Sequence, residues 1–113
     1  MTTFDTGRKA EQVAAEFLQR KGCKILEQNW RTRWCEIDIV AQRQNTIYFC
    51  EVKYRVQAAQ GGGLDYITPK KVEQMRFAAE LWVQSNNWKG EYQLSAIEVF
   101  GPLFQITNVI KDL

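Results

Sequence analysis

The sequence predicts an α+β (α/β) domain in which helices pack against a mixed β-sheet, in the order αβββαββ. Two stretches carry apolar residues at helical spacing, and a β-favouring pair of segments between them is joined by a very short connection. The 113 residues fit one domain, 1–113. With 45% apolar and 25% charged residues, the composition excludes a disordered chain, a collagen and a coiled coil.

The first helix is expected to begin at a cap formed by Asp5 or Thr6 and to run to about Lys21. Gly22 follows as a stop signal. Its apolar stripe consists of Ala10, Val13, Ala14, Phe17 and Leu18. A short strand is expected over 24–30, and residues 31–33 have turn composition.

The central hairpin is expected to consist of strands 36–42 and 46–54. The second is rich in β-branched and aromatic residues. Because only residues 43–45 separate the two strands, they are expected to pair antiparallel. Strict alternation would place Ile37, Ile39 and Ala41 on one face of the first strand. Glu36, Asp38 and Val40 would then share the other face.

The rest of the chain alternates a loop, a helix and two strands. Residues 55–67 contain three consecutive glycines, 61–63, and are expected to form a flexible loop. Thr68 and Pro69 are a cap and a first-turn proline for a helix to about Ser85. Strands are expected over 91–100 and 103–109, and Trp82 and Trp88 are expected to pack the helix against the sheet.

The composition excludes several chemistries. The chain has no histidine, which rules out an imidazole base, a Ser-His or Cys-His pair and a His-ligated zinc. Without a histidine to activate it, Cys35 is expected to be structural rather than a nucleophile. The other two cysteines are Cys23 and Cys50, and no CxxC spacing occurs, so a reducing compartment is favoured over a disulfide framework.

The location expected from the sequence is the cytoplasm. Residues 1–10 contain no apolar run of the kind found in secretory signals. No run of 18 apolar residues is present, so no membrane partner is expected. Partner subunits are plausible for so small a domain, which makes a homodimer one of the alternatives.

Two acidic residues interrupt the central strands where core residues would normally stand. Asp38 lies on one strand, and Glu51 and Lys53 share a face of the next. Across a tight hairpin, Asp38 and Glu51 would be about 5 Å apart, and the repulsion between them could be offset by a divalent cation, Mg²⁺ or Mn²⁺. Lys53 could orient or help deprotonate an attacking water and stabilise transition-state charge. Alternatively, all three side chains are solvated on an exposed face.

Segments spread over residues 5 to 110 resemble the YraN-type family. They are Gly7–Glu11, Gly22–Leu26, Asn29–Arg31, Glu36–Ala41, Phe49–Arg55 and Ile67–Lys71. That family is similar in pattern to restriction-endonuclease-like nucleases, including archaeal Holliday-junction resolvases. The resemblance implies a restriction-endonuclease-like fold with a PD-(D/E)xK site.

The resemblance also implies a role for each matching residue. Asp38 and Glu51 would be metal ligands, Lys53 the catalytic lysine and Glu11 the helix acid that reaches the site. Glu36 would be a further ligand or an exposed neighbour. The backbone carbonyl of Val52 would complete the metal shell.

Three positions depart from the family pattern. Cys35 stands where the family usually has glycine, and Ala10 replaces a common glycine before Glu11. Ser95 stands where an aspartate is frequent. The first two leave every implied ligand in place, and the third removes an acid of unassigned role.

The leading functional hypothesis is a metal-dependent nuclease acting on DNA or structured nucleic acid. Basic residues that could contact phosphate are Arg55, Lys70 and Lys71 around the implied site and Arg31 and Arg33 near the first hairpin. Trp30, Trp34 and Tyr54 lie among them and could stack on bases or pack against arginine stems. Two alternatives stay open: a non-catalytic nucleic-acid-binding module of the same fold, and a small dimeric interaction protein.

Overall fold

The computed structural model describes residues 2–56 and 65–113 and contains two helices and five strands. In chain order these are α1 (Thr3–Arg20), β1 (Lys24–Arg31), β2 (Glu36–Arg43), β3 (Thr46–Arg55), α2 (Pro69–Ser85), β4 (Glu91–Phe100) and β5 (Gln105–Lys111). The predicted α+β class and the order αβββαββ are confirmed. Within the described residues, neither helix is long and apolar enough to cross a membrane.

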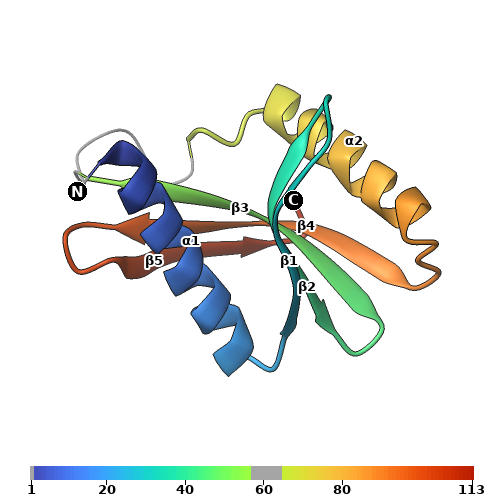
Figure 1. Ribbon diagram of the computed structural model, residues 1–113, viewed down its shortest axis with the longest axis horizontal. Helices are drawn as coiled ribbons and strands as arrows, with labels where there is room; N and C mark the ends of the chain where they lie inside the picture. The colour runs from blue at the N-terminus through green and yellow to red at the C-terminus, as the bar shows by residue number, and fades with distance from the viewer. Residues whose placement is uncertain (1, 57–64) are drawn as a thin grey trace.

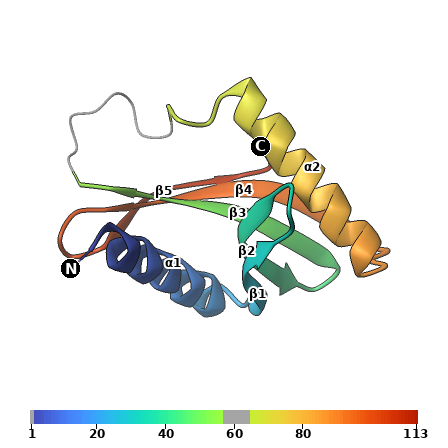
Figure 2. The same cartoon turned by 45° about the horizontal axis from the view of Figure 1, so that its top comes forward.

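The sheet keeps the strands in chain order, β1-β2-β3-β4-β5. All neighbouring pairs are antiparallel except β3 and β4, which are parallel. Parallel neighbours need a crossover connection, and α2 lies within the one between β3 and β4. Figure 2 shows the result: α1 covers one face of the sheet and α2 covers the other.

Each helix buries its own core against the sheet. The core beneath α1 contains Ala14 and Leu18 together with Ile39 and Cys50. The core beneath α2 is built around Phe49, whose ring meets that of Trp82 edge-on at 5.5 Å between centroids. Trp82 is 4% exposed, and Trp88 is also packed in this core, so the expectation for both tryptophans is confirmed.

The start of α1 differs from the prediction. The cap is Thr2, not Asp5 or Thr6. Asp5 is the third helical residue, and its carboxylate accepts a hydrogen bond from the backbone N–H of Thr2, while the Thr2 hydroxyl accepts one from the Asp5 backbone N–H. This reciprocal capping box satisfies two otherwise unpaired donors and moves the start of the helix towards the N-terminus. Gly22, with a φ of 92°, ends the helix as predicted.

One further strand boundary and one face depart from the prediction. The last strand is Gln105–Lys111 rather than 103–109, because a turn occupies residues 101–104. Ile37 does not share a face with Ile39: it packs in the core beneath α2, while Ile39 packs in the core beneath α1. Of the predicted loop 55–67, residues 57–64, including the three glycines, lie outside the described residues. The helix start at Thr68 and Pro69 is confirmed.

Candidate functional site

Asp38 lies where β2 leaves β3. The register between these strands pairs Arg43 with Thr46 at one end and Ile39 with Cys50 at the other. One step further, Asp38 would stand opposite Glu51, but its carboxylate Oδ2 instead accepts a hydrogen bond of 2.8 Å from the backbone N–H of Val52. The carboxylate thus takes the place of a backbone ladder partner at the point where the strands separate.

Asp38 is surrounded by negative charge. Burial of the carboxyl group, followed by the charge of Glu51, raises the pKa of Asp38 from 3.8 to about 7, and Glu11 and Glu36 contribute in the same direction. The hydrogen bond from Val52 acts the opposite way, since it stabilises the ionised form. The ionised form of Asp38 is therefore disfavoured, and the hydrogen bond only partly offsets this.

Glu51 approaches Asp38 from the face covered by α2. It follows Ile47 and Phe49 at two-residue spacing on β3, and both of these pack in the core beneath α2. Its Oε2 lies 3.2 Å from the Nζ of Lys71, a residue in the first turn of α2. Lys71, predicted to contact phosphate, thus already provides a counterion to one of the two central acids.

Lys53 stands two residues beyond Glu51 on β3 and is exposed. Its Nζ lies 5.8 Å from the centre of the Tyr66 ring. The Tyr66 hydroxyl is buried and has no hydrogen-bond partner among the described residues. Burial and the nearby charges of Glu51 and Glu98 raise the pKa of this hydroxyl, so it stays protonated.

The two remaining implied acids lie further from the centre. Glu11 is on α1, which covers the face opposite to the one that carries Glu51, and it acts on Asp38 through its charge (Figure 2). Glu36 forms an exposed ion pair of 2.9 Å with Arg31. For Val52 the structure shows a role for the N–H, as donor to Asp38, and the role of its carbonyl stays a prediction.

A groove of about 530 Å³ opens beside the acids, and Glu51 forms part of its wall. The groove lies between the turn that joins β1 and β2 and the beginning of α2, which are neighbours in Figure 1. The turn supplies Trp34, which is 69% exposed, and α2 supplies Phe77, which is 50% exposed. The other lining residues are Cys35, Glu36, Lys70, Lys71, Glu73, Gln74 and Met75.

Of the predicted phosphate contacts, Lys70 and Lys71 line this groove and Arg55 does not. Arg33 is not a lining residue, but its guanidinium lies 5.4 Å from the centre of the ring of Trp34, which is one. The Arg55 guanidinium is ion-paired with Asp65 and, at 3.3 Å, with Glu98. Its charge is therefore already shared between two carboxylates.

Sequence reasoning missed Glu98 and Tyr66. Glu98 lies on β4, is 6% exposed, and accepts hydrogen bonds from Thr107 Oγ1 at 2.8 Å and Asn108 Nδ2 at 2.7 Å. A signal for Glu98 was present, because it is the one charged residue within the buried run 94–99. Tyr66 offered no comparable signal, since its contacts arise only when β3 and the segment before α2 come together.

The donor set suits a magnesium-like ion only in part. Among residues 2–56 and 65–113, no three His, Cys, Asp or Glu side chains gather closely enough to hold a metal by themselves. Mg²⁺, however, is usually bound by one or two carboxylates together with waters and substrate phosphates. Asp38 and Glu51 supply two carboxylates, and the raised pKa of Asp38 shows that burial and neighbouring charge disfavour its ionised form, which a bound cation would stabilise.

Comparison with known proteins gives one consistent result. The model of the uncharacterised protein family UPF0102 matches residues 10–100. A UPF0102 protein of Flavobacterium psychrophilum is 38% identical over 96 residues, which is 85% of this chain and 81% of that protein. A UPF0102 protein of Cytophaga hutchinsonii is 34% identical over 101 residues, 89% of each chain, and one of Pseudomonas syringae is 39% identical over 83 residues, 74% of this chain and 68% of that protein.

Proposed function

The chain belongs to the uncharacterised protein family UPF0102, and from the arrangement of its carboxylates we propose that it is a metal-dependent nuclease hydrolysing phosphodiesters of DNA or structured nucleic acid. One observation carries this proposal. Burial and the charge of Glu51 raise the pKa of Asp38 to about 7, and Glu51 itself lines a groove that also has Lys70 and Lys71 on its wall. Strongly perturbed carboxylates next to a groove are typical of catalytic sites.

Asp38 and Glu51 would hold Mg²⁺ or Mn²⁺. When bound, such an ion polarises a phosphate oxygen and lowers the pKa of water. The Val52 N–H keeps the Asp38 carboxylate oriented through one oxygen, Oδ2, which leaves the other available as a ligand. The Nζ of Lys71, 3.2 Å from Oε2 of Glu51, restrains the second carboxylate.

Lys53 would stabilise the negative charge that develops on the phosphate. It lies on the same face of β3 as Glu51, and its ammonium group is exposed, so it can move towards a bound phosphodiester. Lys70 on the groove wall would contact a flanking phosphate, and the exposed Trp34 offers an aromatic surface to a base. Each of these contacts is to a group that any nucleic acid presents, so they fix a position and not a sequence.

The test is cleavage of flapped, branched and linear DNA with Mg²⁺ or Mn²⁺. We expect wild-type protein to cleave at least one of these substrates only when metal is added. Asp38→Asn, Glu51→Gln and Lys53→Gln should each reduce the rate at least about a hundredfold, the usual scale for losing one such catalytic group. Lys89→Gln, an exposed charge change in the turn before β4, should leave the rate unchanged.

Two results would overturn the proposal. One is cleavage that persists at wild-type rate in Asp38→Asn and Lys53→Gln, which would trace the activity to a contaminant or to another site. The other is the absence of cleavage on all three substrate types with either metal, together with no change in thermal stability on adding Mn²⁺.

A non-catalytic nucleic-acid-binding module is the second candidate, and the ion pair between Lys71 and Glu51 favours it. This pair already neutralises one of the two acids without a metal. Such a module predicts binding that weakens steeply with salt and does not depend on Mg²⁺ or Mn²⁺. Titration of labelled DNA at several salt concentrations, with and without EDTA, separates the two candidates.

A further inference from the structure

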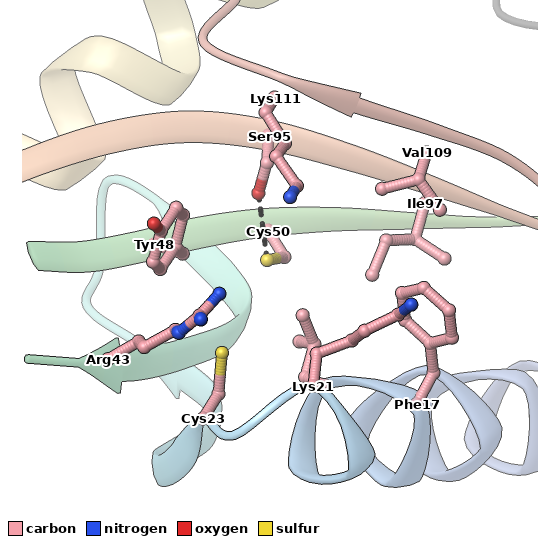
Figure 3. A pocket seen from close by; sticks show the side chains of 11 residues that line it. Phe17, Lys21, Cys23, Arg43, Tyr48, Cys50, Ser95, Ile97, Val109 and Lys111 are labelled. Carbon is pink, nitrogen blue, oxygen red and sulfur yellow. Dashed lines mark hydrogen bonds between the residues drawn. The ribbon is translucent and has the colours of Figure 1, made fainter.

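A second cavity lies on the opposite face of the sheet, between the end of α1 and the strands (Figure 3). Its volume is about 60 Å³. The walls are mostly apolar and come from α1, β3, β4 and β5: Phe17, Leu18, Tyr48, Cys50, Ile97 and Val109. None of the carboxylates of the proposed nuclease site contributes to it.

Three cationic side chains line the same cavity. Lys21 comes from the end of α1, Arg43 from the end of β2 and Lys111 from the end of β5. None of the three forms an ion pair with a described residue, and no carboxylate lines the cavity within that part of the chain. In Figure 3, Arg43 extends into the space between helix and sheet and Lys111 ends near Ser95, whereas Lys21 runs towards Phe17, with its Nζ 5.5 Å from the centre of that ring.

The two thiols at this cavity indicate where the positive charge acts. The inner thiol, Cys50, is buried and hydrogen-bonded to the Ser95 hydroxyl at 2.8 Å, so these two polar groups satisfy each other. Cys23 is nearer the surface. Burial raises the pKa of its thiol, whereas the charges of Arg43 and Lys111 act in the opposite direction, which shows that both cations are felt at this point.

The cavity is small, and its size limits what it can hold. One water needs about 10–15 Å³, so the space takes roughly four to six non-hydrogen atoms, which fits the hydrocarbon tail of a short carboxylic acid whose carboxylate lies beside the cations. An apolar wall favours hydrocarbon, and the positive charges of Arg43 and Lys111 on the same cavity favour an anion between them.

We propose that this cavity binds a small organic anion, with a short hydrocarbon tail against Phe17, Ile97 and Val109 and a carboxylate held by Arg43 and Lys111. The proposal does not depend on the nuclease function, because the two sites share no lining residue. It also assigns a role to Arg43 and Lys111, which form no ion pair with a described residue.

The test is titration of ¹⁵N-labelled protein with sodium pentanoate, at constant ionic strength, followed by amide chemical shifts. We expect saturable shifts confined to residues around the cavity, including Cys23, Cys50 and Val109. Pentanamide, which has the same tail and no charge, should give none at equal concentration. Across acetate, butanoate and pentanoate, affinity should rise about fourfold per added methylene and then level off by octanoate, once the cavity is full.

Variants separate this site from general attraction of anions to a basic protein. Arg43→Gln and Lys111→Gln should each weaken pentanoate binding by about two- to fivefold, and together by about tenfold. Arg20→Gln removes an exposed charge from α1 outside the cavity and should have no effect. Inorganic phosphate should bind more weakly than pentanoate, because it cannot fill the apolar part.

The proposal fails if pentanamide produces the same shifts as pentanoate, or if affinity is independent of tail length. It also fails if the double variant binds as tightly as wild type. Shifts that rise linearly with every anion and never saturate would likewise count against a built site.

Discussion

Replacing Asp38 with asparagine should make the protein more stable at neutral and alkaline pH. The substitution removes a carboxylate whose ionised form is opposed by burial and by Glu51, and it keeps a side-chain oxygen that can accept the hydrogen bond from Val52. Most substitutions of partly buried polar residues destabilise. A gain in stability is therefore a distinctive outcome.

The magnitude follows from the pKa. Raising the pKa of Asp38 from 3.8 to about 7 corresponds to about 4 kcal/mol of lost stability once the group is ionised in both folded and unfolded states. Partial exposure to water and local relaxation reduce this, so we expect the free energy of unfolding of Asp38→Asn to exceed that of wild type by about 2–3 kcal/mol at pH 8. This gain is equivalent to a rise in Tm of about 10 °C.

The effect must depend on pH with a defined sign. Between about pH 4 and pH 7 the Asp38 carboxyl group is protonated in the folded wild type and already ionised in the unfolded chain, because the folded-state pKa is raised. The stability of wild type therefore falls relative to that of the variant as the pH rises through this window. Near pH 4 the two proteins should differ by well under about 1 kcal/mol. Above pH 7 the difference should be constant.

Urea unfolding followed by tryptophan fluorescence, in EDTA at pH 4 and pH 8, measures both values. Glu73→Gln is the matched control, because it makes the same change in charge at an exposed position on the groove wall. It should alter stability by no more than about 0.5 kcal/mol. A variant Asp38→Asn that is less stable than wild type at pH 8, or a difference of the same size at both pH values, would refute the electrostatic account of this site.

Three further outcomes follow from other contacts. Thr68→Ala removes the hydroxyl that accepts the Lys71 backbone N–H at the start of α2 and should cost about 1 kcal/mol in urea unfolding. Phe49→Leu removes edge-to-face contacts to the rings of Trp82 and Tyr92, at 5.5 and 5.6 Å between centroids, and should lower the free energy of unfolding by about 1–2 kcal/mol. The stability gained by Asp38→Asn should be at least as large in the Phe49→Leu background as in wild type. Lys71→Gln frees Glu51 from its ion pair, so the rise in Tm on adding Mn²⁺ should be larger than in wild type; a smaller rise would show that Lys71 supports the metal rather than competing with it.

Local signals in the sequence predicted most of the fold because each element is specified by neighbouring residues. The Thr68–Pro69 start of α2 and Gly22 at the end of α1 are decided by backbone geometry within a few residues, and the sequence states them directly. The predicted start of α1 was wrong because the two reciprocal hydrogen bonds between Thr2 and Asp5 outweigh the single hydrogen bond that a cap at Asp5 or Thr6 would form.

The candidate site was less predictable because it depends on a departure from regular geometry. Alternation along β2 places Ile37 and Ile39 on the same face, whereas the strand changes face between them. The same deviation turns Asp38 towards the Val52 N–H instead of placing it opposite Glu51 in a flat ladder. The pairing of Lys71 with Glu51 was also invisible, because it needs the position of α2 over the sheet.

Asp38 lies between two residues of β2 whose side chains point to opposite faces of the sheet. Ile37 packs in the core beneath α2 and Ile39 packs in the core beneath α1, so the regular alternation of side chains is broken at Asp38. A leucine or valine at this position would leave the Val52 N–H without its present partner, whereas an asparagine would satisfy it without charge. Structure alone therefore explains an oxygen acceptor at position 38 but not a carboxylate, which destabilises the fold at neutral pH. The metal ion proposed above would supply a reason for the charge, and Glu51, whose charge acts on Asp38, lines the groove through which such an ion and a phosphate would enter.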